Sequence, residues 1–177
     1  EEIKEFLNYI KDNKEKTIVG ERIKRSESLL FQVCYKMHKL ITFTFTGNII
    51  KFGNFTCLPK KTVEKMINEK ATWNSFSGAL TKVEKDLISI PSIRGSRYFG
   101  PSKMSFYNLI KHSLSIISVF RKTFLIRSAL FIVLYILLIR TNASVITAIP
   151  LILLLIAVYS ISNLALRENM DEFEKSL

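Results

Sequence analysis

Hydrophobic positions recur with a helical period at the start of the chain and change to a strand-like run soon afterwards. Residues 2–13 carry apolar side chains at helical spacing and charges on the other face, which predicts an amphipathic helix. Residues 17–20, Thr-Ile-Val-Gly, form a β-branched run that predicts a buried strand followed by a turn at Gly20. A helix that leads into a strand is typical of a parallel α/β sheet.

A long apolar-rich stretch at residues 28–45 predicts a helix that ends at Gly47. Phe43 and Phe45 extend the apolar character beyond the main stripe of this helix. Two interpretations fit this pattern. Either the helix packs into a core, or part of it lies on the interface of a bilayer.

Three short strands are expected in the next part of the chain. Residues 49–51 and 55–58 predict two of them, separated by a turn or kink at the Gly53–Asn54 pair. Residues 87–90 predict the third, which Pro91 is expected to close. All three are short apolar runs bounded by glycine or proline, as buried strands often are.

Two helices are expected between these strands. Residues 60–69 are charged and amphipathic, which predicts the first helix. The Trp73–Asn74 pair lies near the start of the second, with Thr72 as the predicted N-cap. The alternation of strands and helices predicts an α/β fold for this part of the chain.

The last third of the chain is far more apolar. Residues 105–120 place apolar side chains on one broad face, which is typical of a helix lying in the plane of a membrane. Residues 123–139 and 145–166 are each long enough to cross most of a bilayer core of about 30 Å. The short polar link at residues 140–144 makes them a helical hairpin, so both ends lie on one side.

Charged residues set the predicted orientation of this hairpin. Arg127 interrupts the first span near one end, where its side chain is expected to reach the headgroups. Arg121, Lys122 and the basic soluble part flank the entry to that span, so the soluble part and both termini are expected in the cytoplasm. His112 is interpreted as a surface histidine of the in-plane helix rather than a catalytic one.

Composition narrows the class of partner. The chain has 177 residues and a formal charge of +11 at pH 7, which indicates anionic partners. Because the cations lie beside a predicted membrane part, anionic lipid and phosphorylated substrates are favoured over nucleic acid. Cys34 and Cys57 are expected to be free thiols rather than a disulfide, and the isolated His38 and His112 give no metal-ligand spacing.

Two cationic runs follow predicted strands. Residues 21–26, Glu-Arg-Ile-Lys-Arg-Ser, come after the first strand, and residues 94–104, Arg-Gly-Ser-Arg-Tyr-Phe-Gly-Pro-Ser-Lys-Met, come after the last. The carboxyl ends of parallel strands are where open α/β sheets bind ligands, and cations beside a bilayer suit a phosphate. A solvated basic loop and a set of juxtamembrane anchors are the alternatives.

These segments, in this order, resemble the C-terminal part of a family 2 glycosyltransferase of the polyprenyl-phosphate or dolichol-phosphate sugar synthase type. The matching pieces are Val19-Gly20-Glu21-Arg22, Phe52-Gly53-Asn54-Phe55, Trp73-Asn74 and residues 94–104. The Arg-Tyr-Phe-Gly-x-Ser-Lys-Met stretch is the specific part, and the other pieces gain weight from their order. The resemblance covers nearly the whole chain.

The resemblance implies a GT-A fold and the transfer of a sugar from a nucleotide-sugar donor to a polyprenyl-phosphate lipid or another membrane-proximal acceptor. It implies catalytic roles for Arg97 and Lys103, whose charge would stabilise the departing nucleotide diphosphate. Arg94 and Ser102 are expected to bind that diphosphate together with Arg97.

The same resemblance assigns an acceptor side. Arg22 matches a position associated with the acceptor's phosphate, and Lys24 and Arg25 are neighbouring candidates on charge alone. Asn54, Trp73 and Asn74 are expected to line the acceptor pocket.

The chain also departs from the family pattern. It contains no Asp-x-Asp motif, so the ligands of the Mg²⁺ or Mn²⁺ expected in the full-length enzyme are not in this sequence. Either the chain is a piece that lacks the donor-binding half, or it is a degenerate relative; truncation is favoured because the remaining order is intact. Ser75 stands where such enzymes often carry a larger polar residue, so no acid–base role is assigned there.

The expected organisation has four parts: a partial GT-A domain at 1–103, an interfacial helix at 104–121, a transmembrane hairpin at 122–166 and a cytoplasmic tail at 167–177. The resemblance also allows the chain to form a homo-oligomer. The alternative function is that of a non-catalytic basic membrane protein, which binds anionic lipid or scaffolds a partner.

Overall fold

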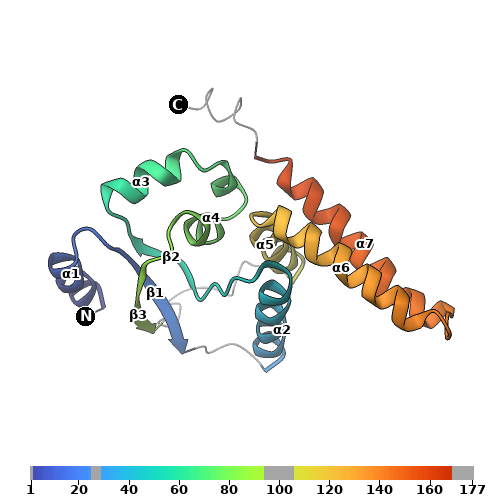
Figure 1. Cartoon of the computed structure of the whole chain (residues 1–177). Helices are drawn as coiled ribbons and strands as arrows, with labels where there is room; N and C mark the ends of the chain where they lie inside the picture. Colours follow the sequence, from blue (N-terminus) through green and yellow to red (C-terminus); the bar gives the residue numbers. More distant parts are fainter. Residues whose placement is uncertain (1, 25–28, 94–105, 169–177) are drawn as a thin grey trace.

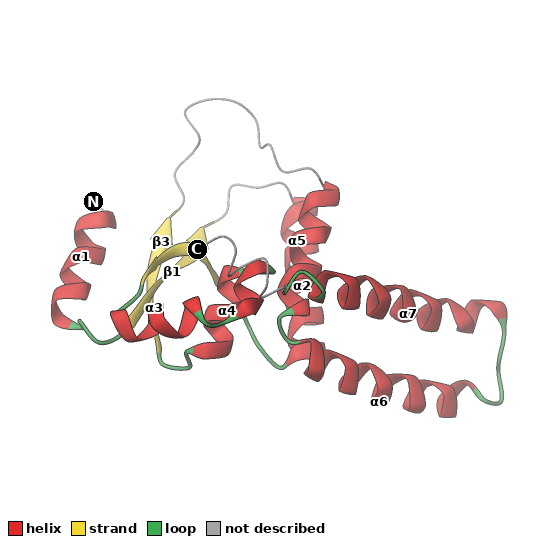
Figure 2. Ribbon diagram, turned by 90° about the horizontal axis from the view of Figure 1, so that it is seen from above, coloured by secondary structure: helices red, strands yellow, loops and turns green. Residues whose placement is uncertain are grey.

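The computed structural model describes residues 2–24, 29–93 and 106–168, and Figures 1 and 2 show two views of it. In chain order the elements are α1 (Glu2–Asp12), β1 (Thr17–Lys24), α2 (Leu29–Thr46), β2 (Phe52–Cys57), α3 (Lys60–Ile67), the 3-10 helix η1 (Lys70–Trp73), α4 (Phe76–Val83), β3 (Leu87–Ile93), α5 (Phe106–Ser118), α6 (Arg121–Ile139) and α7 (Val145–Ala165). The mixed α/β class predicted from the sequence is confirmed.

The three strands form one small mixed sheet in the order β2-β1-β3. β1 pairs with β3 in parallel, from Thr17 opposite Leu87 to Lys24 opposite Ile93. β2 pairs with the other side of β1 in antiparallel fashion. The two parallel strands therefore begin at one edge of the sheet and end together at the opposite edge.

Gly20 does not turn the chain, so the predicted turn there is wrong, and β1 continues to Lys24. The glycine is needed for space instead. A Cβ atom at Gly20 would lie 2.5 Å from Cδ1 of Phe55, whose ring packs against Phe6 of α1 at a centroid distance of 4.5 Å. The register between β1 and β2 shifts between Val19 and Glu21, close to this approach.

Two further strand predictions are wrong. No strand is assigned at residues 49–51, and a single strand, β2, includes the Gly53–Asn54 pair, which is therefore not a turn between two strands. The pairing with β1 is irregular there, since Phe52 faces Glu21 and Thr56 faces Val19, and this agrees with the alternative of a kink. β3 likewise continues past Pro91, which lies opposite Glu21 of β1. Among the described strands β3 is an edge strand, the position where a proline's missing N–H costs the sheet least.

The sheet has a hydrophobic cluster on each face because Ile18 and Val19 are consecutive and point to opposite sides. Ile18 packs with Phe6 of α1 and Ile90 of β3. On the other face Val19 packs in a cluster with Met66, Ala71, Ala79, Leu80 and Val119. Helices α3 and α4 thus cover one face, α1 covers part of the other, and Val119 ties the sheet unit to the end of α5.

The ends of the helices explain one more difference from the sequence prediction. Thr72 is not an N-cap; its hydroxyl donates to the Met66 carbonyl at 3.3 Å. Ser75 caps α4 instead, with its Oγ accepting from the Gly78 N–H at 3.2 Å. Ser75 thus serves as the N-cap of α4. The family that the sequence resembles often carries a larger polar residue at this position.

Helices α6 and α7 are long and apolar enough to cross a membrane. They form an antiparallel pair that projects from the sheet unit, with the link at residues 140–144 at the far end (Figures 1 and 2). Most of their large apolar side chains are exposed, among them Leu134, Leu138, Ile146 and Leu153. α7 begins with a capping box at Ser144, and Pro150 lies within its first two turns.

Helix α2 is fastened to the first half of α6. The Arg127 Nη1 donates to the carbonyls of Phe43 at 3.1 Å and Thr44 at 2.7 Å, which lie at the C-terminal end of α2. Gly47 adopts a φ of 74° and its N–H donates to the same Phe43 carbonyl at 2.7 Å, so it ends α2 as predicted. Arg127 therefore reaches the end of a helix, where the sequence predicted only contact with headgroups.

Candidate functional site

The candidate site lies at the edge of the sheet where the parallel strands end. Arg22 pairs with Ser92 and Lys24 pairs with Ile93. Because β1 and β3 are parallel neighbours, the chain leaves both strands at the same edge. Residue 94, the first of the cationic stretch, therefore directly follows the partner of Lys24 in the ladder. The structure thus brings together the ends of the two strands that the cationic runs follow, which lie about seventy residues apart in the sequence.

This part of the site depends on strand length as well as on strand order. The sequence placed Arg22 in a turn after Gly20, whereas the structure places Arg22 and Lys24 in the last residues of β1. Arg25, Arg94, Arg97, Ser102 and Lys103 lie outside the described residues. Their predicted roles at a donor diphosphate or an acceptor phosphate stay predictions.

The three residues expected in an acceptor pocket have different environments. Asn54 is exposed in the middle of β2. Trp73 ends η1 and is 48% exposed. Asn74 is buried, and its Nδ2 donates to Oε1 of Glu168 at 2.9 Å. The Oδ1 of Asn74 has no hydrogen-bond partner within the part of the chain that the structure describes.

The bond between Asn74 and Glu168 has a consequence for the hairpin. Glu168 lies just after the end of α7, while Asn74 belongs to the sheet unit. The end of α7 is thus held next to the sheet unit (Figure 1). Sequence reasoning named Asn74 but gave no signal for this partner, which is 94 positions away.

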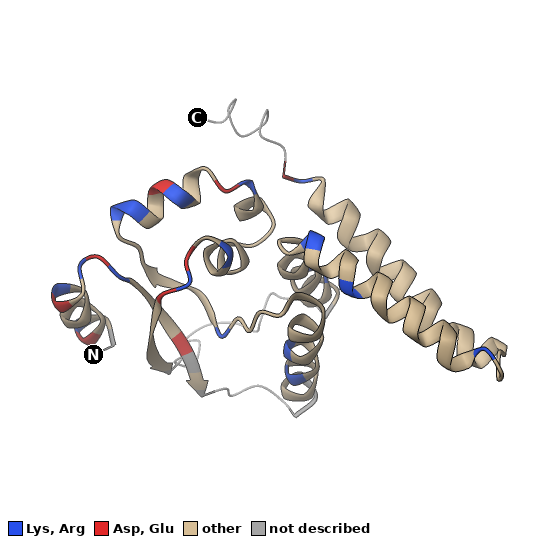
Figure 3. Ribbon diagram, viewed as in Figure 1, with Lys and Arg blue, Asp and Glu red and all other residues tan. Residues whose placement is uncertain are grey.

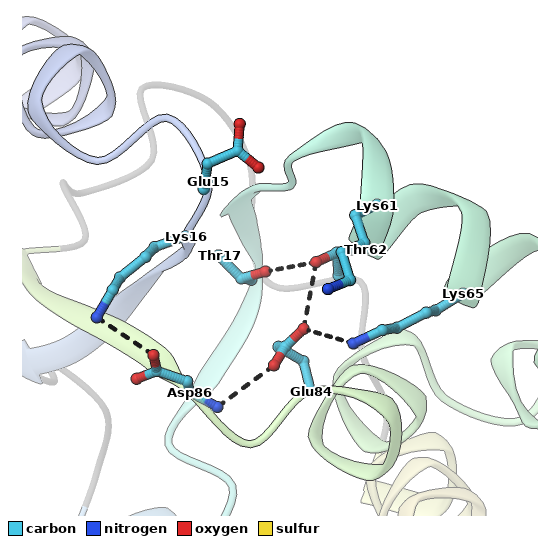
Figure 4. Close-up of a pocket in the computed structure, with 8 residues that line it drawn as sticks. All are labelled: Glu15, Lys16, Thr17, Lys61, Thr62, Lys65, Glu84 and Asp86. Atoms are coloured by element: carbon cyan, nitrogen blue, oxygen red, sulfur yellow. Dashed lines mark hydrogen bonds and ion pairs between the residues drawn. The ribbon is translucent and has the colours of Figure 1, made fainter.

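A polar pocket lies at the opposite edge of the sheet, near the starts of β1 and β3 (Figure 4). Its volume is about 160 Å³, and its lining includes buried Thr17 and Thr62, whose hydroxyl oxygens lie 3.0 Å apart. Glu84 accepts from Thr62 at 3.4 Å and from the Lys65 ammonium at 3.0 Å. The hydrogen bond from Lys65 is the main cause that lowers the pKa of the Glu84 carboxyl.

The charges of this pocket are largely neutralised in pairs. Lys65 pairs with Glu84, and Lys16 pairs with Asp86 at 3.2 Å. These contacts join the start of β1, the first turns of α3 and the loop before β3 (Figure 4). We interpret the pocket as a structural junction, because paired charges leave little positive potential for a phosphate. It was not predicted, since Thr17 and Thr62 carry no motif.

The two histidines lie on neighbouring helices. His112 is exposed on α5, which agrees with its prediction as a surface residue. His38 of α2 is half-buried, and its Nδ1 lies 3.4 Å from the Thr42 hydroxyl. Burial, and secondly the charge of His112, lowers the pKa of His38.

Residues 2–24, 29–93 and 106–168 contain no group of three or more His, Cys, Asp and Glu side chains that could hold a metal ion. The described residues therefore give no ligand set for the Mg²⁺ or Mn²⁺ that the resemblance implies, and no step is assigned to it. Cys34 and Cys57 are free thiols, as predicted.

The chain was also compared with known proteins. No protein-family model, no curated protein and no solved structure matches it.

Proposed function

We propose that this chain is the acceptor side and the membrane part of a membrane-anchored glycosyltransferase with a GT-A fold. The enzyme would transfer a sugar from a nucleotide-sugar donor to a polyprenyl phosphate or another membrane-proximal acceptor. The resemblance of residues 94–104 to family 2 enzymes supplies the reaction class.

One observation carries the proposal. The parallel strands β1 and β3 end side by side, and the helices that follow them, α2 and α5, both contact α6. From the sheet edge that carries Arg22 and Lys24, the chain continues from β1 to α2 and from β3 to α5. Both helices lie at the sheet-side end of the two apolar spans. This arrangement supports a phosphate site close to a membrane surface.

The proposed chemistry uses the cations in two groups. Arg22, Lys24 and Arg25 hold the phosphate of the acceptor, and one phosphate oxygen attacks the anomeric carbon of the sugar. The bond from that carbon to the nucleotide diphosphate breaks, and the diphosphate takes the electron pair. The second group stabilises the growing charge on the diphosphate. It consists of the cations of Arg94, Arg97 and Lys103, together with the hydroxyl of Ser102. The acceptor phosphate is already an anion, so the step needs no general base.

The proposed topology places α6 and α7 across the bilayer and the sheet unit in the cytoplasm. The hydrogen bond between Asn74 and Glu168 supports the placement of both hairpin ends on one side. The sheet-side end of α6 carries three cations, Arg121, Lys122 and Arg127. The link at the far end, residues 140–144, carries one cation, Arg140, so the excess of positive charge lies on the proposed cytoplasmic side.

Sugar transfer by the full-length polypeptide that contains this chain tests the proposal. Arg97→Ala is expected to abolish transfer while the protein still inserts into membranes, and Arg97→Lys is expected to impair it because an ammonium cannot replace a bidentate guanidinium. Arg140→Ala, in the link at the far end of the hairpin, is the matched control and should leave transfer unchanged. Full activity of Arg97→Ala would remove the proposed mechanism.

A second candidate is a non-catalytic protein that binds anionic lipid through its charge. It is favoured by the basic, acid-free composition of α2, α5 and α6. Under this alternative Arg97→Lys would be silent in every assay, since only the charge would matter. The same substitution therefore separates the two functions.

A further inference from the structure

The outer face of α2 is an uncovered apolar surface. Val33, Met37, Leu40 and Ile41 fall at helical spacing and are 53%, 56%, 65% and 43% exposed. We call these four residues the outer stripe. Large apolar side chains gathered on one exposed face mark an interaction site more often than scattered ones do.

The opposite face of α2 is already occupied. Thr42 and Thr46 are buried there. Between that face and the outer stripe, the Phe45 ring lies 5.4 Å from that of Phe124 and 6.5 Å from that of Phe131, both in α6. α2 is thus packed against α6 by one face while the outer stripe points away from that contact. Intramolecular packing by α6 therefore leaves the outer stripe uncovered.

The charge around the outer stripe has one sign. Helices α2, α5 and α6 contain no Asp or Glu, and α7 contains no charged residue. The cations of the first three helices are Lys36, Lys39, Lys111, Arg121, Lys122 and Arg127 (Figure 3). A partner that fits this surface must offer apolar depth together with negative charge.

Two occupants can be compared on these grounds. A second copy of the chain would bring the exposed Lys36, which borders the outer stripe, close to the same lysine in a two-fold contact, so like charges would oppose the pairing. An anionic bilayer offers acyl chains for the stripe and phosphates for the lysines. The bilayer is also the surface that α6 and α7, which are joined to α2, are suited to enter.

We propose that α2 docks on the surface of an anionic bilayer, with the outer stripe immersed at the boundary between headgroups and acyl chains. Lys36, which is exposed one helical turn before Leu40, then lies at the level of the lipid phosphates. The inference shares with the proposed function only the insertion of α6 and α7, and it does not depend on sugar transfer.

Spin-label depth measurements on the full chain in proteoliposomes test this docking. In a background of Cys34→Ala and Cys57→Ala, a nitroxide is attached through Leu40→Cys on the outer stripe. Matched labels are attached through Ile67→Cys on α3, which is exposed at 51%, and Leu134→Cys on α6, which is exposed at 61%. Collision with oxygen and with a water-soluble nickel complex is measured in vesicles of phosphatidylcholine, with and without phosphatidylglycerol.

With phosphatidylglycerol present, the Leu40 label is expected about 5–10 Å inside the headgroup boundary, the Ile67 label in water and the Leu134 label deep in the bilayer. Without it, the Leu40 label is expected to become more accessible to nickel. A Leu40 label as accessible as the Ile67 label, beside a deep Leu134 label, would overturn the docking alone. Unchanged immersion in neutral vesicles would overturn the role of anionic lipid.

Two other outcomes also contradict the inference. Spin–spin broadening between Leu40 labels of separate copies would show that a second copy of the chain covers the stripe. A Leu134 label in water would show that α6 is not inserted, which would overturn the proposed function as well as this docking.

Discussion

Replacing Arg127 with methionine removes a guanidinium from the junction between α2 and α6. In the structure this group donates to the carbonyls of Phe43 and Thr44 at 3.1 and 2.7 Å. These carbonyls belong to the last turn of α2, where a helix leaves its acceptors without intrahelical partners. The Phe43 carbonyl also accepts from the N–H of Gly47 at 2.7 Å, which remains in the variant. The substitution therefore takes a cationic cap from a helix C-terminus and leaves an unbranched, uncharged side chain in place of the arginine stem.

The size of the effect follows from these contacts. A hydrogen bond to a charged group contributes about 1.5–3 kcal/mol, and a cation at a helix C-terminus about 0.3–1 kcal/mol. Because Arg127 is exposed, water competes for its guanidinium, and we expect a total near the lower end, about 1.5 kcal/mol. A loss of about 1.4 kcal/mol corresponds to a tenfold change in a local opening equilibrium.

Hydrogen–deuterium exchange read by mass spectrometry measures this opening directly. For the protein in detergent micelles, Arg127→Met is expected to raise amide exchange about tenfold in the last turn of α2, with little change in α3 and α4. Arg121→Met, at the start of the same α6, is the matched control, because no described contact of Arg121 reaches α2. Unchanged exchange at the end of α2 in Arg127→Met would refute the capping role.

Gly47 gives an independent approach to the same junction. Its φ of 74° disfavours any residue with a Cβ, and a Cβ there would lie 2.9 Å from Nη2 of Arg127. Gly47→Ala should therefore open the end of α2, and part of its cost should disappear in the Arg127→Met background. Strict additivity of the two substitutions would show that the groups do not interact.

Two further predictions concern stability. Thr62→Val leaves the buried Thr17 hydroxyl without its partner at 3.0 Å and should lower the free energy of unfolding by about 1–3 kcal/mol. The double variant, with valine at both positions, should recover part of this loss. A thermal melt in which Thr62→Val matches the unmodified protein would contradict the prediction. Folding lowers the pKa of His38 from 6.5, so the stability that its neutral form contributes is complete above pH 6.5 and is lost as the pH falls below that value. His38→Gln should therefore weaken the dependence of the melting temperature on pH between pH 7 and pH 5. The same dependence in the variant and in the unmodified protein would argue against this role.

The sequence predicted the two long apolar helices and most of the other helices because their signals are long. The apolar runs of α6 and α7 extend over many residues, and the amphipathic pattern of α1 is regular, so each prediction averages over several turns. Gly47 was also placed correctly, since a glycine after a long apolar helix has few other uses.

The strands were harder to predict because glycine and proline are ambiguous in short segments. Gly20 looked like a turn, but the ring of Phe55, thirty-five positions away, decides its role. Pro91 looked like a strand end, but β3 is an edge strand of the described sheet and accommodates it. Both depend on tertiary neighbours, which no local pattern contains.

The candidate site was predictable only in part. Its two cationic runs are visible in the sequence, but their common edge follows from the parallel pairing of β1 with β3. The bonds from Arg127 to α2 and from Asn74 to Glu168 had no sequence signal, because their partners are more than eighty residues apart.

A phosphate site at the ends of β1 and β3 requires that this chain recognise the phosphate of a polyprenyl lipid. Native mass spectrometry of the chain in detergent micelles measures the retention of a polyprenyl phosphate against the uncharged polyprenol of the same length. We expect retention of the phosphate about tenfold or more above the alcohol, because one charge-assisted hydrogen bond contributes about 1.5–3 kcal/mol. The double variant Arg22→Gln with Lys24→Gln should reduce this preference. Equal retention of the two lipids, or a preference unchanged by the double variant, would contradict this phosphate site.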